Sequence, residues 1–194
     1  TEGVLKDYDS GYGTRNTNLI GSDEDESIYA YSGDDTITGG KGNDTLYGSS
    51  GNDTYIFNLG DGQDTINEEN AGSAADKVVF GTGIKPEDIT VTRDGNDMVL
   101  LVGSKGDSLR IVKQYTHNYY QVESFVFDGG NTVVKAADLF AKPLEISNLT
   151  EGVLKDYDSG YGTRNTTLIG SEKAELIYAY SGDDTIISGA GNDI

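Results

Sequence analysis

One apolar residue returns every nine positions along the first third of the chain. An amphipathic helix repeats its apolar face every three or four residues and a half-buried strand repeats it every two, so neither accounts for this spacing. Gly commonly stands four residues before the apolar position, and Thr, Glu or Asp stands two residues before it. The apolar series is Leu19, Ile28, Ile37, Leu46 and Tyr55, with Ile66 following after eleven residues. Self-similarity at so short a period predicts a stacked or solenoid architecture.

The unit "GGKGNDTLY", from Gly39 to Tyr47, shows what one repeat can form. Its glycines allow backbone angles that are closed to other residues, so the first six residues predict a turn. The last three suit a very short strand with Leu46 pointing inward. Two consecutive units then make one coil of two turns and two strands, and stacked coils give two parallel sheets with turn loops along both edges. Asp35 and Asp53 are expected on one edge, and Asp44 and Asp64 on the other.

The charge of the chain gathers in these repeats. The net charge is −19; residues 22–70 hold twelve acidic residues and one basic residue, whereas residues 77–142 hold eight of each sign. Stacked carboxylates repel one another unless a cation lies between them. Ca²⁺ prefers six to eight carboxylate and carbonyl oxygens, and Mg²⁺ needs a stricter octahedron. Zinc is disfavoured because the chain has no Cys and one His. The pattern indicates several Ca²⁺ ions; the alternative is a set of ordinary turns with solvated carboxylates.

The repeats resemble the glycine-rich nonapeptide of RTX (haemolysin-type) proteins, G-G-x-G-x-D-x-U-x, which binds Ca²⁺ in a β-helix. "GGKGNDTLY" fits every position, and "AYSGDDTIT" and "GSSGNDTYI" fit most of them. The resemblance implies an all-β fold: a calcium-binding parallel β-roll (β-solenoid), then a small antiparallel β cap, then the start of a second β-roll. It also implies that each ion lies between one loop and the loop one coil later.

The resemblance assigns ligands residue by residue, most of them through backbone carbonyls. Thr17 replaces the aspartate of the earliest loop, and Phe57-Asn58 is read as a two-residue insertion. The two sites that match best combine Tyr31, Gly33 and Asp35 with Gly48, Ser50 and Asp53, and Gly40, Gly42 and Asp44 with Leu59, Asp61 and Asp64. Two weaker sites combine Gly13 and Arg15 with Ala30, Ser32 and Asp35, and Ser22, Glu24 and Glu26 with Gly39, Lys41 and Asp44.

A different pattern begins at Lys77. The stretches "KVVF", "ITVTR", "DMVLLVG", "SLRIVKQY" and "VESFVF" alternate or run apolar, with Gly-containing turns between several of them. They predict antiparallel strands, and "KPED" and "VKAADLF" predict a helical turn each. This half resembles the haemolysin-type calcium-binding-related segment that follows RTX repeats. We expect it to cover the open end of the roll, where Tyr55, Phe57 and Ile66 would otherwise meet water.

Little in the chain points to catalysis. His117, within "QYTHNYY", is the one histidine and has no partner nucleophile at a recognisable spacing. Hydrolysis by paired carboxylates stays open, although Asp94, Asp97, Asp107 and Asp128 flank turns, where Asp bonds locally. The tyrosines at 115, 119 and 120 favour packing, and contact with a sugar or a protein is the alternative.

The sequence therefore predicts a non-enzymatic, calcium-binding structural module of a secreted RTX protein. The resemblance implies type I export and a place outside the cell or on a bacterial surface. Its partners would be Ca²⁺ and neighbouring modules of the same chain. Acidity argues against nucleic acid, and no run reaches the length of a membrane span. Two alternatives stay open: an adhesin module that binds a sugar or host protein, and the non-catalytic tail of a secreted toxin or enzyme.

A long repeat divides the chain further. Residues 1–45 return at 150–194 with 36 of 45 pairs identical, so the chain reads as part of a tandem array. We expect a roll at 1–70, a cap at 71–142, a linker at 143–149 and a truncated second roll at 150–194.

The second copy is expected to bind fewer ions than residues 12–67. Asp184 would need a partner loop beyond residue 194, so only Glu175 and Asp193 can close a coil, with Ser171, Lys173, Ser188 and Ala190 giving carbonyls. Anomalous calcium peaks in crystals measure this difference. An equal number of ions in both copies, without help from a neighbouring molecule, would refute the expectation.

Overall fold

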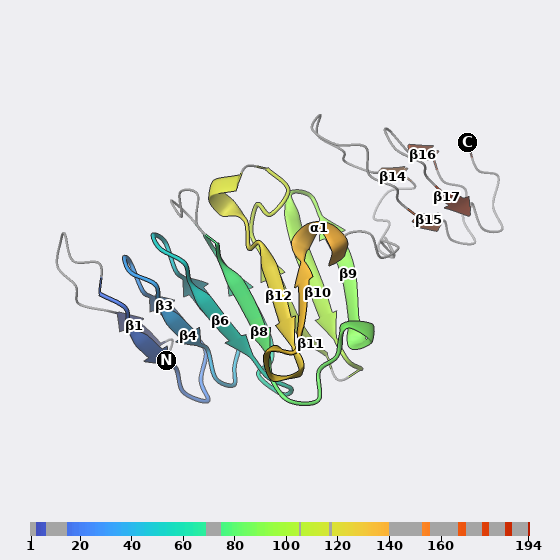
Figure 1. Cartoon of the computed structure of the whole chain (residues 1–194). Coiled ribbons are helices and arrows are strands. Elements are labelled where there is room, and N and C mark those ends of the chain that lie inside the picture. Colours follow the sequence, from blue (N-terminus) through green and yellow to red (C-terminus); the bar gives the residue numbers. More distant parts are fainter. Residues whose placement is uncertain are drawn as a thin grey trace.

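The computed structural model describes residues 3–6, 15–68, 75–104, 106–116 and 118–139, with four short strands and the last residue of the second copy (Figure 1). Between residues 3 and 139 its elements are β1 (Gly3–Lys6), β2 (Asn18–Ile20), β3 (Glu26–Tyr29), β4 (Thr36–Thr38), β5 (Thr45–Tyr47), β6 (Thr54–Phe57), β7 (Gln63–Ile66), β8 (Lys77–Phe80), η1 (Pro86–Asp88), β9 (Ile89–Asp94), β10 (Asp97–Val102), β11 (Asp107–Ile111), η2 (Asn118–Tyr120), β12 (Ser124–Phe127), η3 (Asp128–Gly130), β13 (Thr132–Lys135) and α1 (Ala136–Leu139).

Successive short strands of the repeat region alternate between two sheets. One sheet has the order β1-β3-β5-β7-β11-β10-β9, and the other has the order β13-β12-β8-β6-β4-β2. Every pair within the repeats is parallel, and Leu19 faces Ile37 while Ile28 faces Leu46. Each residue thus faces the equivalent residue two repeat units later, so the predicted coil of two turns and two strands is confirmed.

The apolar series lies inside the roll, as its spacing predicts. The three-residue repeat strands bury their central residue and leave the flanking residues at least partly exposed, as in β4 and β5. Fully burying one such aliphatic side chain contributes about 1.5–3 kcal/mol. The buried series comprises Leu19, Ile28, Ile37, Leu46, Tyr55 and Ile66. A short repeat strand therefore gives the core one side chain, and stability requires many stacked coils.

The cap continues both sheets of the roll. Its hairpins β9–β10, β10–β11 and β12–β13 are antiparallel, as predicted. At the junction, however, β8 pairs with β6, β11 with β7 and β12 with β8, all in parallel. The sequence did not predict these parallel contacts, because alternation of apolar residues looks the same in a strand of either direction. In Figure 1 the blue and cyan strands of the roll pass into the green and yellow strands of the cap.

Aromatic rings close the roll at this junction. Phe57 of the roll meets Phe80 edge-on, with ring centroids 6.3 Å apart, and Phe80 stacks on Phe127 at 4.8 Å. Tyr55, Phe57 and Ile66 are each at most 1% exposed. The expectation that the second half covers the end of the roll is therefore confirmed.

Both helical turns predicted in the second half of the module are present. "KPED" forms the single turn η1, and "VKAADLF" supplies α1, although Val134 and Lys135 still belong to β13. Among the described helices, none is long and apolar enough to cross a membrane.

The second copy repeats the pairing of the first. Its described strands are β14 (Val153–Lys155), β15 (Thr167–Ile169), β16 (Leu176–Tyr178) and β17 (Thr185–Ile187). β14 pairs in parallel with β16 in the same register as β1 with β3, and β15 pairs with β17 in the same register as β2 with β4. The predicted linker 143–149, the ligand Asp193 and the other predicted ligands of this copy lie outside the described residues.

Candidate metal centre

Carboxylates form a ladder along the edge that precedes β4, β6 and β8. The backbone N–H of Thr17 donates to Asp35 Oδ1 at 2.7 Å, and that of Asp35 donates to Asp53 Oδ1 at 2.9 Å. The N–H of Asp53 then donates to Asp76 Oδ1 at 2.8 Å, and that of Asp76 donates to Glu123 Oε2 at 2.7 Å. Each carboxylate therefore reaches back one coil, and the chain of bonds runs from the roll into the cap.

The opposite edge carries a second ladder. The N–H of Glu26 donates to Asp44 Oδ1 at 2.8 Å, and that of Asp44 donates to Asp64 Oδ1 at 3.0 Å. Asp35 and Asp53 thus share one edge and Asp44 and Asp64 share the other, as the coil of two repeat units predicts. These four side chains are buried.

Two of the ladder carboxylates, Asp44 and Asp53, each keep one oxygen without a hydrogen bond. Asp44 Oδ2 and Asp53 Oδ2 are buried and accept no hydrogen bond. A buried acceptor without a partner is costly, and a buried charge without one costs more. These leftover oxygens, on two edges of the same stack, fit the hard-oxygen chemistry of Ca²⁺.

Glycine makes room for these oxygens. A Cβ on Gly39 would collide with Asp44 Oδ2, and a Cβ on Gly48 would collide with Asp53 Oδ2. Gly42 has a φ of +119°, and a Cβ there would lie 2.7 Å from the carbonyl oxygen of Glu24 in the preceding coil. Glycine therefore lets each carboxylate turn into its own loop and lets carbonyl groups of successive loops approach closely.

The structure brings together the loops of the first predicted site. The N–H of Ser50 donates to the carbonyl of Tyr31 at 2.9 Å, and the N–H of Gly33 donates to the carbonyl of Ser50 at 2.9 Å. Ser32 and Ser50 also form a parallel bridge. A carbonyl oxygen has two acceptor positions, so one accepted hydrogen bond does not by itself prevent a carbonyl group from binding a cation. Their role as ligands, with Gly48, stays a prediction.

The second predicted site spans the insertion. Gly42 and Gly62 form a parallel bridge, so the two loops stay in register although the later coil is longer, as the predicted insertion requires. Leu59 is 52% exposed. The carboxylate of Asp61 accepts from the backbone N–H of Asn58 at 2.7 Å, so it holds the enlarged turn. The carbonyls of Leu59, Asp61 and Gly40 stay predicted ligands.

The two weaker sites are described in part. The N–H of Lys41 donates to the carbonyl of Ser22 at 3.1 Å, and the carboxylate of Glu26 accepts from the N–H of Ser22 at 2.9 Å. A Cβ on Gly33 would collide with the carbonyl of Arg15, so those loops also touch. Gly13 lies outside the described residues. The assignment of Ala30 and Ser32 as carbonyl ligands stays a prediction.

Burial disfavours the charged form of these groups. It raises the pKa of Asp53 to about 6 and that of Asp64 to about 8, and neighbouring carboxylates add to both shifts. Burial also raises the pKa of Asp44, Glu68 and Asp76. At neutral pH the stack is therefore unfavourable unless protons or a cation offset its charge.

Sequence reasoning missed three carboxylates of this edge: Glu68, Asp76 and Glu123. Asp76-Lys77-Val78 repeats the spacing of Asp53-Thr54-Tyr55, and Val78 faces Tyr55 across the sheet. That spacing could have shown a further coil, but it falls later in the chain than the repeat period requires. Glu68 carries no such signal.

Comparisons with known proteins agree with this geometry. A family model described as the RTX calcium-binding nonapeptide repeat (4 copies) matches residues 20–55 and 161–194. A second one, the haemolysin-type calcium binding protein related domain, matches residues 97–137. The chain therefore carries RTX calcium-binding repeats together with a haemolysin-type calcium-binding-related segment.

One relative is the iron-regulated protein FrpA of Neisseria meningitidis serogroup C. It is 36% identical over 144 residues, which are 71% of this chain and 10% of the relative. The chain thus spans about a tenth of that protein's length.

The cap offers other polar groups with defined partners. Arg110 donates to Asp97 and to Asp94, both at 2.8 Å, so each aspartate forms an ion pair with Arg110 of β11. Arg93 lies over the ring of Tyr115 at 4.3 Å. His117 lies outside the described residues.

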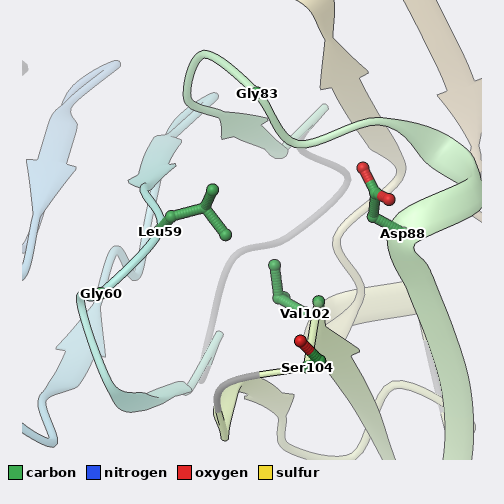
Figure 2. Close-up of a pocket in the computed structure, with 7 residues that line it drawn as sticks. Leu59, Gly60, Gly83, Asp88, Val102 and Ser104 are labelled. Carbon is green, nitrogen blue, oxygen red and sulfur yellow. The ribbon is translucent and has the colours of Figure 1, made fainter.

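A pocket of about 270 Å³ lies between the insertion turn and the cap (Figure 2). Its wall is largely Leu59, Val102 and glycine backbone, and its polar side chains are Asp88 and Ser104. Among the described residues that line it, none has an aromatic ring for a sugar to stack on, and its two polar side chains belong to the cap.

Replacing Asp44 by Asn should weaken calcium binding by about tenfold or more, because the number of charged ligands sets the affinity of such sites. Asp25→Asn is the matched control, since Asp25 faces solvent on the same edge and its oxygen accepts from Asn43 at 2.7 Å. Calorimetric titration measures both variants. Equal calcium affinities would show that the buried ladder position has no special role.

Without calcium, the chain should lose stability as the pH rises from 5 to 8. The folded state raises the pKa of Asp53 and Asp64, so it binds more protons than the unfolded state in this range, and stability falls with pH. The β signal of calcium-free protein in circular dichroism, in about 0.5 M NaCl, which screens exposed charges, tests this and should be larger at pH 5 than at pH 8. A β signal that is equal or larger at pH 8 would contradict it.

Proposed function

We propose that this chain is a calcium-dependent structural module, repeated in tandem within a secreted RTX protein. Residues 12–70 are unfolded when calcium is scarce, and they fold into the roll when calcium binds. The observation that carries this proposal is the pair of carboxylate ladders, in which buried oxygens of Asp44 and Asp53 accept no hydrogen bond.

The energetics support a folding switch. The roll gains about one buried apolar side chain per short strand, while each coil adds two carboxylates to its edges. Because the ligand oxygens come together only in the stacked state, the free energy of metal binding becomes free energy of folding.

The switch suits export. A chain that stays unfolded in a low-calcium cytosol can be threaded through a type I system and can fold outside, where calcium is abundant. The proposed location is therefore extracellular or on a bacterial surface. The cap then acts as a stop, because it covers the end of the roll and removes its open edges.

We infer no catalytic role for the module. The buried carboxylates are held by backbone N–H groups. Among the alternatives, a sugar-binding role receives little support from the pocket at Leu59, because none of the described residues that line it has an aromatic ring.

Calcium should therefore control the fold. After chelation the chain should lose β signal in circular dichroism and lose heat resistance, and millimolar Ca²⁺ should restore both. Mg²⁺ at equal concentration should do much less, because it resists dehydration and irregular geometry. A spectrum and melting point unchanged by chelation would overturn the proposal.

A further inference from the structure

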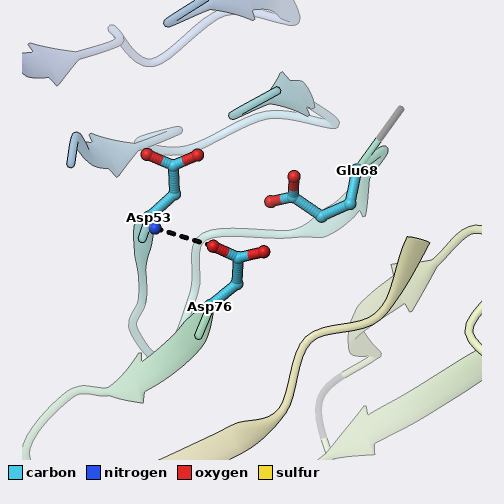
Figure 3. A group of neighbouring side chains, drawn as sticks. All are labelled: Asp53, Glu68 and Asp76. Carbon is cyan, nitrogen blue, oxygen red and sulfur yellow. Dashed lines mark hydrogen bonds between the residues drawn. The ribbon is translucent and has the colours of Figure 1, made fainter. Parts of the chain in front are cut away.

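Three carboxylates meet where the roll joins the cap. One oxygen each of Asp53, Glu68 and Asp76 lies within 4.8 Å of the others, and all three side chains are fully buried (Figure 3). Asp53 comes from the loop before β6, Glu68 follows β7, and Asp76 precedes β8. The cluster therefore combines the last repeat loop of this edge with residues from outside the predicted repeat sites.

Each of these carboxylates uses one oxygen and leaves the other without a partner. Asp53 Oδ1 accepts from Asp35, Asp76 Oδ1 accepts from Asp53, and Glu68 Oε1 accepts from the hydroxyl of Tyr55. Asp53 Oδ2, Glu68 Oε2 and Asp76 Oδ2 are buried and accept no hydrogen bond. Figure 3 shows the three side chains converging on a common space.

None of the ion pairs in the described residues brings a positively charged side chain to this cluster. Lys41, Lys85 and Arg110 pair with other carboxylates, and the charged neighbours that act on Glu68 are themselves acidic: Asp53, Asp76 and Glu123. Three buried carboxylates so close together repel strongly. A structural role in packing would favour neutral side chains here.

Tyr55 fits this cluster in a specific way. It occupies the inward position that Ile37 fills one coil earlier. Its hydroxyl donates to Glu68, whereas an aliphatic residue could not. The residue thus fills the core with its ring and orients Glu68 with its hydroxyl.

We infer that Asp53, Glu68 and Asp76 form an additional Ca²⁺ site that fastens the roll to the cap. It differs from the predicted repeat sites in having three carboxylates instead of two, and Glu68 and Asp76 lie outside the matched repeats at 20–55 and 161–194. Three hard anionic oxygens make this a high-charge calcium site. It rests on the calcium chemistry of the proposed function and shares Asp53 with a predicted repeat site, but Glu68 and Asp76 belong to no predicted repeat site.

Native mass spectrometry of the full chain, titrated with calcium, tests the site by counting ions. Glu68→Gln should bind one ion fewer than the unchanged chain at saturation and should keep its calcium-induced β signal. Glu87→Gln is the control, because Glu87 is exposed in the cap. An unchanged ion count and affinity in Glu68→Gln would overturn the inference.

Tyr55→Phe gives an independent reading if Glu68→Gln fails to fold. It keeps the ring and removes only the hydroxyl that orients Glu68, so one ion should bind about tenfold more weakly or worse. A calcium titration identical to that of the unchanged chain would overturn the inference. Failure of the proposed function looks different, because the unchanged chain would then bind no calcium.

Discussion

Repulsion between buried carboxylates is the constraint on which the rest of this structure depends. Each coil of two repeat units places one acidic side chain at each edge, and stacking puts these groups directly above one another. Backbone N–H groups satisfy one oxygen of each carboxylate, but the other oxygens of Asp44, Asp53 and Asp76 have no hydrogen bond. These buried carboxylate oxygens make folding of the roll unfavourable without a cation, and they are also the groups that can bind one.

The short strands follow from the same constraint. A strand as short as β4 or β5 is enough to bury one aliphatic side chain, and the rest of each unit forms the loop that carries the carboxylate. Glycine is needed where the loops touch, as at Gly42 against Glu24, because a side chain there would separate the coils. The core strand and the carboxylate-bearing loop are therefore parts of one repeat unit.

The cap shows how a repeat stack can end. A parallel roll leaves unpaired strand edges at its last coil, and these edges invite association with other chains. Here β8 and β11 pair with the last strands of the roll, and antiparallel hairpins then complete both sheets. The phenylalanines at 57, 80 and 127 fill the space that the next coil would have occupied. The charge of the cap is balanced, which suits a segment that carries few stacked carboxylates.

The sequence by itself determined the repeat unit, the size of the coil and the sharing of edges by Asp35 with Asp53 and by Asp44 with Asp64. It could do so because a fixed period repeats the same local geometry, so one unit predicts the next. The tertiary structure alone decided that β8 and β12 join the roll in parallel and that Glu68 and Asp76 meet Asp53. These contacts form after the period is lost, across separations that no spacing rule covers. Whether a distant carboxylate reaches a repeat loop depends on how the chain folds back, and only the packed structure contains that information.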